Sequence, residues 1–155
     1  MNPYYRATRK EREQACRSLS IQPIFVEVAT PGDVANAVAE VARRGGQGLL
    51  VEPEEVFQAN RIELMRVVLR HALPMATSRA FIREVGALVS YDNVESEEAD
   101  RGAAFVDRIL RGAKPADLPV EQPTKFELKI NLKTAKALGI VVPTTLLSRA
   151  HEVIE

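Results

Sequence analysis

Short apolar runs alternate with longer stretches of helical period over the first two thirds of the chain. The runs are bounded by glycine, proline or polar residues, which is typical of buried strands, and they occupy residues 24–28, 48–51, 75–78 and 87–91. Between the first two runs, Thr30 is placed to cap a helix, and Val34, Val38 and Val41 recur on one helical face. Gly45-Gly46 ends that pattern. The alternation predicts an α/β protein.

Other stretches of the chain extend this pattern. Helices are predicted at residues 4–19, 54–72 and 79–85, and at residues 96–112, where acidic residues gather at the start and basic residues at the end. Pro115, Pro119 and Pro123 mark an extended connector. Residues 126–132 alternate apolar and polar positions, which predicts a strand with one face in solvent. A short helix at 133–138 and a carboxy-terminal helix at 145–154 complete the predicted elements.

Composition restricts the class of protein further. A chain of 155 residues with 46% hydrophobic and 27% charged residues is typical of one soluble globular domain. The formal net charge of zero gives no basic field, so nucleic acid is not an expected partner. A single cysteine, Cys16, excludes an internal disulfide. The sequence shows neither an apolar run long enough to span a membrane nor the apolar core of a signal peptide.

Catalytic motifs are missing from the sequence. It contains no phosphate-binding glycine loop, no Gly-x-Ser-x-Gly elbow and no paired-histidine zinc motif. Residues 45–48 are glycine-rich but follow a helix, which indicates helix termination. Cys16, His71 and His151 have no visible catalytic neighbours and are interpreted as structural or surface residues. The prediction is a non-enzymatic protein without a cofactor or a metal site.

The carboxyl ends of the predicted strands carry the polar side chains of interest. Ligands of open parallel α/β sheets bind at this edge. Here it offers Thr30, Glu52, Ser78-Arg79 and Tyr91, a set suited to a small polar or zwitterionic solute. The alternative interpretation is that these residues are ordinary helix caps and loop starts.

The carboxy-terminal half resembles a known family. The run AFVDRILRGAKPADLPVEQPTKFEL at residues 104–128, followed by INLKTAKALG at 130–139 and Pro143, closely resembles the substrate-binding proteins of ABC transporters with the type 1 periplasmic-binding fold, in the group that includes tryptophan- and tyrosine-binding members. Upstream, the looser resemblance rests on Phe57, Arg61, Ser78-Arg79 with Phe81, and Gly86 with Ser90-Tyr91. Two positions depart from the family's pattern, because Val85 and Asp92 stand where the family has glycine.

The resemblance implies one lobe of a two-lobed architecture, with a three-layer, open, mostly parallel sheet and helices on both faces. It assigns residues 1–112 to a solute-binding-like lobe, and residues 113–155 to a connector, strand and helices that pack on this lobe or on a partner lobe. The helix at 96–112 and the strand at 126–132 then belong with a missing lobe, which leaves Phe105 and Ile109 without cover. A second lobe from another chain, folding back of these elements, or a homodimer would cover them.

The function implied is solute binding for an ABC permease, with an aromatic amino acid among the candidate ligands. The expected ligand-binding residues are Arg79 for a carboxylate, Tyr91 or Phe57 for stacking, Glu52 for an amine, and Ser78. The family implies a periplasmic or extracytoplasmic location, whereas a complete gene product without an export signal would remain in the cytoplasm. Two alternatives stay open: a truncated, self-associating interaction module without its own ligand site, and a small enzyme on the same fold.

Overall fold

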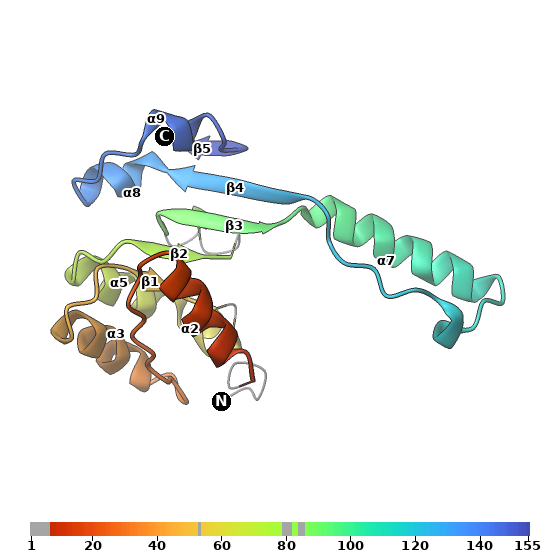
Figure 1. Cartoon of the computed structure of the whole chain (residues 1–155), viewed down its shortest axis with the longest axis horizontal. Coiled ribbons are helices and arrows are strands. Elements are labelled where there is room, and N and C mark those ends of the chain that lie inside the picture. Colours follow the sequence, from red (N-terminus) through yellow and green to blue (C-terminus); the bar gives the residue numbers. More distant parts are fainter. Residues whose placement is uncertain (1–6, 53, 79–81, 84–85) are drawn as a thin grey trace. The chain divides into compact units, whose positions relative to one another are not determined.

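A computed structural model of the chain describes residues 7–52, 54–78, 82–83 and 86–155. The chain divides into two compact units, Met1–Ala76 and Thr77–Glu155. Helices and strands alternate in both, so the predicted α/β class is confirmed (Figure 1). The sequence analysis divided the chain at residue 112, on the basis of the lobes of the resembling family. That division stays a prediction.

The five described strands form one mixed sheet in the order β1-β2-β3-β4-β5. Strand β1 (Leu49–Leu50) pairs in parallel with β2 (Met75–Thr77). Strand β3 (Val89–Asn93) pairs antiparallel with β4 (Phe126–Asn131), and β4 pairs in parallel with β5 (Glu152–Ile154).

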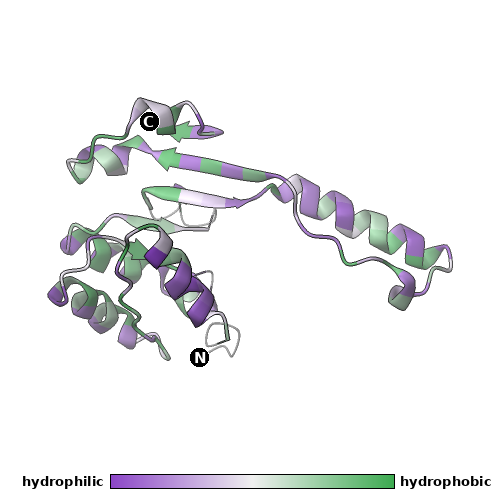
Figure 2. Ribbon diagram, viewed as in Figure 1, coloured by the Kyte–Doolittle hydropathy of each residue, from purple (hydrophilic) through white to green (hydrophobic). Residues whose placement is uncertain are grey.

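Most of the core of the first unit comes from two helices, α3 (Asp33–Arg43) and α5 (Arg61–Arg70), which pack against each other. Val51, Leu73 and Met75 complete it. The predicted stripe of α3 is confirmed, because Val34, Val38 and Val41 are its buried residues. Helix α5 contributes Leu64, Met65, Val67 and Val68. Each such side chain stabilises the fold by about 1.5–3 kcal/mol through burial. By contrast, α2 (Arg9–Ser18) buries no residue and is hydrophilic along its length (Figure 2).

Three local predictions for the first unit are wrong. Residues 21–29 form no strand, because a β-branched run becomes one only where a neighbouring strand completes its ladder. The helix predicted over 54–72 divides at Asn60 into α4 (Glu55–Ala59) and α5, and the Asn60 side chain donates to the Val56 carbonyl at 2.8 Å. Thr30 does not cap α3. Instead, its amide and hydroxyl both donate to the Asp33 carboxylate at 2.8 Å, which lowers the pKa of that carboxyl.

The core of the second unit surrounds the end of β4. Ile82, Ala87, Ile130 and Ala135 are buried there. Asn131 caps α8 (Leu132–Ala137), because its side-chain oxygen accepts from the Thr134 amide at 3.1 Å. The Thr134 hydroxyl donates to the Gly86 carbonyl at 2.6 Å. These bonds join the β4–α8 corner to the segment before β3.

The predicted carboxy-terminal helix is also wrong. Only Thr144–Leu147 is helical, as α9, and β5 follows it. The amide of His151 donates to the Leu128 carbonyl at 2.8 Å, and His151 Nδ1 accepts from the Leu128 amide at 3.1 Å. Pairing with β4 therefore overrides the local helical pattern, and His151 has a structural role.

Helix α7 (Glu95–Leu110) agrees with the predicted helix at 96–112 to within two residues and is followed by a short 3-10 turn, η1 (Pro115–Asp117). None of its residues is buried. In Figure 1 it extends away from β3 and β4, with the connector beside it. Arg101 ties the two together, because its guanidinium donates to the Gln122 carbonyl at 2.6 Å. Among the described residues, no helix is long and apolar enough to cross a membrane.

Candidate ligand-binding site

Two of the predicted ligand-binding residues lie in the first unit. Glu52 follows β1, and its carboxylate is 3.1 Å from the Arg12 guanidinium of α2. The two side chains are 32% and 28% exposed, so the ion pair is partly shielded from water. Phe57 lies half-buried in α4. The Glu52 carboxylate therefore already has one cationic partner.

Two other predicted residues lie in the second unit. Ser78 directly follows β2 and is half-buried, whereas Tyr91 lies in the middle of β3 and is 64% exposed. Arg79, the predicted carboxylate partner, lies outside the described residues, as do Phe81 and Val85. Asp92, at the other position that departs from the family, accepts a hydrogen bond from the Asn93 amide at 3.0 Å.

Phe126, which the sequence analysis missed, is a neighbour of a predicted site residue. Its ring stacks on that of Tyr91, with centroids 5.5 Å apart and planes inclined by 12°. The register explains the contact: Asn93 lies opposite Phe126, so Tyr91 is its diagonal neighbour across the strand pair. Phe126 is itself 43% exposed. The two rings form an exposed aromatic pair, and the only sequence signal for it was an aromatic residue at the start of an alternating strand.

The second unit also contains two buried hydroxyl groups that have no hydrogen-bond partner among the residues that the structure describes. Thr77 and Ser90 are both at least nine-tenths buried. Among the hydrogen bonds of the described residues, neither hydroxyl oxygen has a partner. A buried hydroxyl without a partner costs about 1–3 kcal/mol. Sequence reasoning considered Ser78 and passed over Thr77 beside it.

Within the described part of the chain, no group of three or more His, Cys, Asp or Glu side chains could hold a metal ion. Cys16 is half-buried, and the pKa shifts that are resolved belong to Asp33 and to the Arg83–Glu152 ion pair. The Arg83 hydrogen bond lowers the pKa of the Glu152 carboxyl, and burial opposes this. Arg83 and Glu152 form an ion pair at the surface, and Asp33 bonds to Thr30. None of these three groups has the environment of a catalytic residue.

The described elements define an α/β protein, a class in which ligands commonly bind beyond the carboxyl ends of the strands. The particular family follows from its sequence profile. The profile described as "ABC transporter substrate binding protein" matches residues 8–154, and the chain therefore belongs to this family. No curated protein sequence matches the chain.

Solved structures show the same fold. A Streptococcus pneumoniae ABC domain in complex with L-Trp has a TM-score of 0.86 at 22% identity, covering 96% of this chain and 50% of that one. A conserved domain protein from Vibrio cholerae has a TM-score of 0.85 at 20% identity, with coverage of 95% and 49%. The ligand-free, open form of a Clostridium difficile substrate-binding protein with adhesive properties has a TM-score of 0.70 at 14% identity, with coverage of 99% and 51%.

This chain thus spans about half the length of the solved structures it matches. The resemblance to one lobe of the type 1 periplasmic-binding fold is confirmed by these matches.

Proposed function

We propose that this chain is a solute-binding component of an ABC-type importer, or a half-length relative of one, and that it binds a small molecule such as an amino acid. The observation that carries the proposal is the family match over residues 8–154. The similar fold in complex with L-Trp supports an aromatic amino acid as the first ligand to test.

The exposed aromatic pair supports this ligand class. One face of Tyr91 stacks on Phe126, and the ring as a whole is 64% exposed. It therefore offers a surface on which an aromatic side chain can stack, and such a contact contributes about 0.5–1.5 kcal/mol. In this proposal, Phe57 supplies a further apolar contact.

Polar groups would hold the charged end of the ligand. We assign its carboxylate to Arg79, since a guanidinium binds a carboxylate through two parallel hydrogen bonds. The hydroxyl group of Ser78 supplies an additional donor. Its amine would bind the Glu52 carboxylate beside the ion pair with Arg12.

Transport would require a second lobe. Two-lobed binding proteins close around a ligand by hinge motion, and the closed form is recognised by the permease. A single lobe holds half of the contacts and does not close on itself. The proposal therefore places the chain outside the cytoplasmic membrane, where family members typically act, with an ABC permease as partner.

Isothermal titration calorimetry with L-Trp, L-Tyr, L-Phe and a set of nucleosides tests the proposal. We expect heat from an aromatic amino acid, and a Kd about 2–12 times higher for Tyr91→Ala, from the stacking energy above. Tyr91→Phe keeps the stacking surface and should bind like the original chain. Val120→Ala changes a connector side chain that is 97% exposed and serves as the control. No heat with any compound at millimolar concentration would contradict ligand binding by this chain.

A second candidate function is self-association through α7. The observation that favours it is the apolar surface of this helix, where Val106, Ile109 and Leu110 are exposed. Contiguous exposed apolar side chains commonly mark interaction sites. Sedimentation velocity should then show a dimer that Ile109→Asp dissociates, while Asp107→Asn, next to this surface, leaves it intact. A monomer that binds an amino acid in solution would rule out this second function.

A further inference from the structure

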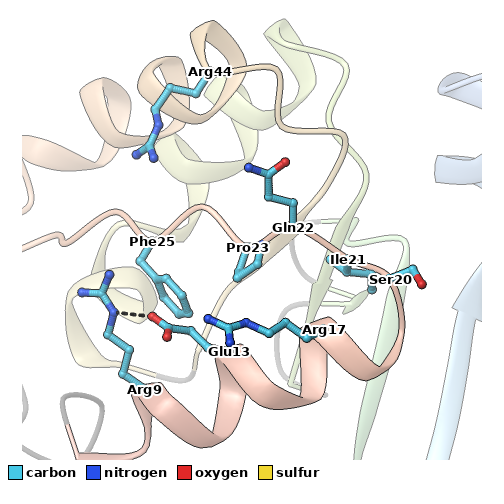
Figure 3. A pocket seen from close by; sticks show the side chains of 9 residues that line it. All are labelled: Arg9, Glu13, Arg17, Ser20, Ile21, Gln22, Pro23, Phe25 and Arg44. Carbon is cyan, nitrogen blue, oxygen red and sulfur yellow. Dashed lines mark hydrogen bonds and ion pairs between the residues drawn. The ribbon is translucent and has the colours of Figure 1, made fainter.

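A hollow of about 590 Å³ opens in the first unit beside α2, and it is lined by three arginines. Its walls are one face of α2, residues 20–25 and the end of α3 (Figure 3). Small-molecule sites typically have volumes of about 300–1,000 Å³. The hollow therefore has the size of a ligand site, and its position differs from that of the predicted ligand-binding residues.

The face of α2 that lines the hollow carries Arg9, Glu13 and Arg17, four residues apart along the helix. Residues at this spacing lie one above another on a helix surface. Arg12, which pairs with Glu52, is turned about 140° away from Arg17, given the helical rotation of about 100° per residue. The same helix therefore presents one arginine to the candidate ligand-binding site and two to the hollow.

Arg9 is held in place by two contacts. Its guanidinium lies 3.1 Å from the Glu13 carboxylate and 4.6 Å from the centre of the Phe25 ring. Arg9 and Glu13 thus compensate each other's charge, and Phe25 covers one face of the guanidinium.

Arg17 and Arg44 have no such compensation. Among the described residues, neither guanidinium takes part in a side-chain hydrogen bond or ion pair. Arg44 follows the end of α3, and Figure 3 shows both side chains directed toward the same hollow from opposite sides. With three arginines and one glutamate, the lining carries a net charge of +2. Two uncompensated cations facing one hollow favour an anion between them.

The floor of the hollow is apolar. Pro23, Phe25 and the half-exposed Ile21 line it between the charged walls. We propose that this hollow is a second binding site, for a small phosphate monoester. Its dianionic phosphate would bind Arg17 and Arg44, and its apolar body would lie on Pro23 and Ile21. Guanidinium groups suit this ligand because they bind phosphate oxygens in a bidentate manner, and the phosphate charge of nearly −2 at pH 7 matches the lining.

Phenyl phosphate is the probe for this site, measured by calorimetry at low ionic strength. We expect binding that weakens as salt is added, and at least a tenfold loss of affinity in Arg17→Gln and in Arg44→Gln. Arg43→Gln is the matched control, because Arg43 is paired with Glu40 at 2.6 Å and does not line the hollow. Circular dichroism verifies that each variant is folded, and Arg17→Lys tests the bidentate contact if the glutamine variant does not fold.

Three results would overturn the proposal. The first is that phenyl phosphate does not bind. The second is that Arg43→Gln loses as much affinity for it as Arg17→Gln and Arg44→Gln do, which would indicate general electrostatic attraction. The third is binding to vesicles of anionic phospholipid without binding of phenyl phosphate, which would indicate a membrane surface as the partner. Tyr91→Ala should leave phenyl phosphate binding unchanged, so the outcome is independent of the proposed amino-acid site.

Discussion

Replacing Asn131 by alanine tests whether one side chain holds the β4–α8 corner together. Asn131 is buried, with 6% of its surface exposed. Its oxygen accepts from the Thr134 amide at 3.1 Å, and its side-chain nitrogen donates to the Ile82 carbonyl at 3.4 Å. Alanine would remove both interactions, and the second loss would leave a buried carbonyl without its donor.

The two losses can be estimated separately. Removing an asparagine cap costs about 1 kcal/mol, and leaving a buried acceptor unsatisfied costs about 1 kcal/mol more at the long distance seen here. Asn131→Ala should therefore lower the free energy of unfolding by about 2 kcal/mol. For a chain of this length, that loss corresponds to a decrease in Tm of about 4–8 °C.

Asn131→Ser separates the two contributions, because the serine hydroxyl can still cap the helix but is too short to donate to the Ile82 carbonyl. Urea unfolding followed by circular dichroism should place it between the original chain and Asn131→Ala. Hydrogen exchange at the Thr134 amide reports the cap directly and should accelerate in the alanine variant alone. If Asn131→Ala and Asn131→Ser were equally stable, or if neither differed from the original chain, the cap would not contribute as argued.

Three further predictions concern other parts of the chain. Ile130→Ala, at a fully buried position, should cost about 2–5 kcal/mol in urea unfolding, whereas Val120→Ala should change stability by less than about 0.5 kcal/mol. Gly46→Ala should destabilise the protein by about 1–3 kcal/mol, since the added Cβ would lie 2.4 Å from a valine methyl group of α3. Gly102→Ala should stabilise α7 by about 0.5–1 kcal/mol, because alanine favours the helix more than glycine does and no atom lies within 4 Å of the added Cβ. Hydrogen bonding lowers the pKa of the Glu152 carboxyl below its ordinary 4.5, so its stabilising effect is present above pH 4.5 and lost as the pH falls through the lower folded-state pKa. The original chain should therefore be more stable than Glu152→Gln at pH 7, and the two should converge as the pH falls below the lowered folded-state pKa of Glu152; a difference in stability that did not change with pH would contradict the assignment.

The candidate site was only partly predictable from the sequence. Strand ends identified Glu52 and Ser78 as candidates, because a short apolar run ends visibly where its first polar residue begins. Tyr91 was placed at a strand end by the same pattern, whereas it lies in the middle of β3. The partners of these residues were not visible. Arg12 is forty positions from Glu52, and Phe126 is thirty-five positions from Tyr91, so neither contact leaves a local pattern.

The same distinction separates the correct and incorrect secondary-structure predictions. Helices α3 and α7 were predicted nearly to their ends, since periodicity, glycine stops and end charges all act within a few residues. The strand predicted at 24–28 and the helix predicted at 145–154 were wrong. In both cases the outcome depends on whether another strand supplies a hydrogen-bonding edge, which local propensity does not report.

The sequence by itself determined the α/β class and the resemblance to a family. The class follows from hydrophobic periodicity and the resemblance from a long motif, both of which are properties of the linear chain. The tertiary structure decided three other matters: the stacking of Tyr91 on Phe126, the pairing of Glu52 with Arg12, and the approach of Arg17 and Arg44 to one hollow. Each depends on strand register or on the packing of a helix, and these bring together residues that are far apart in the chain.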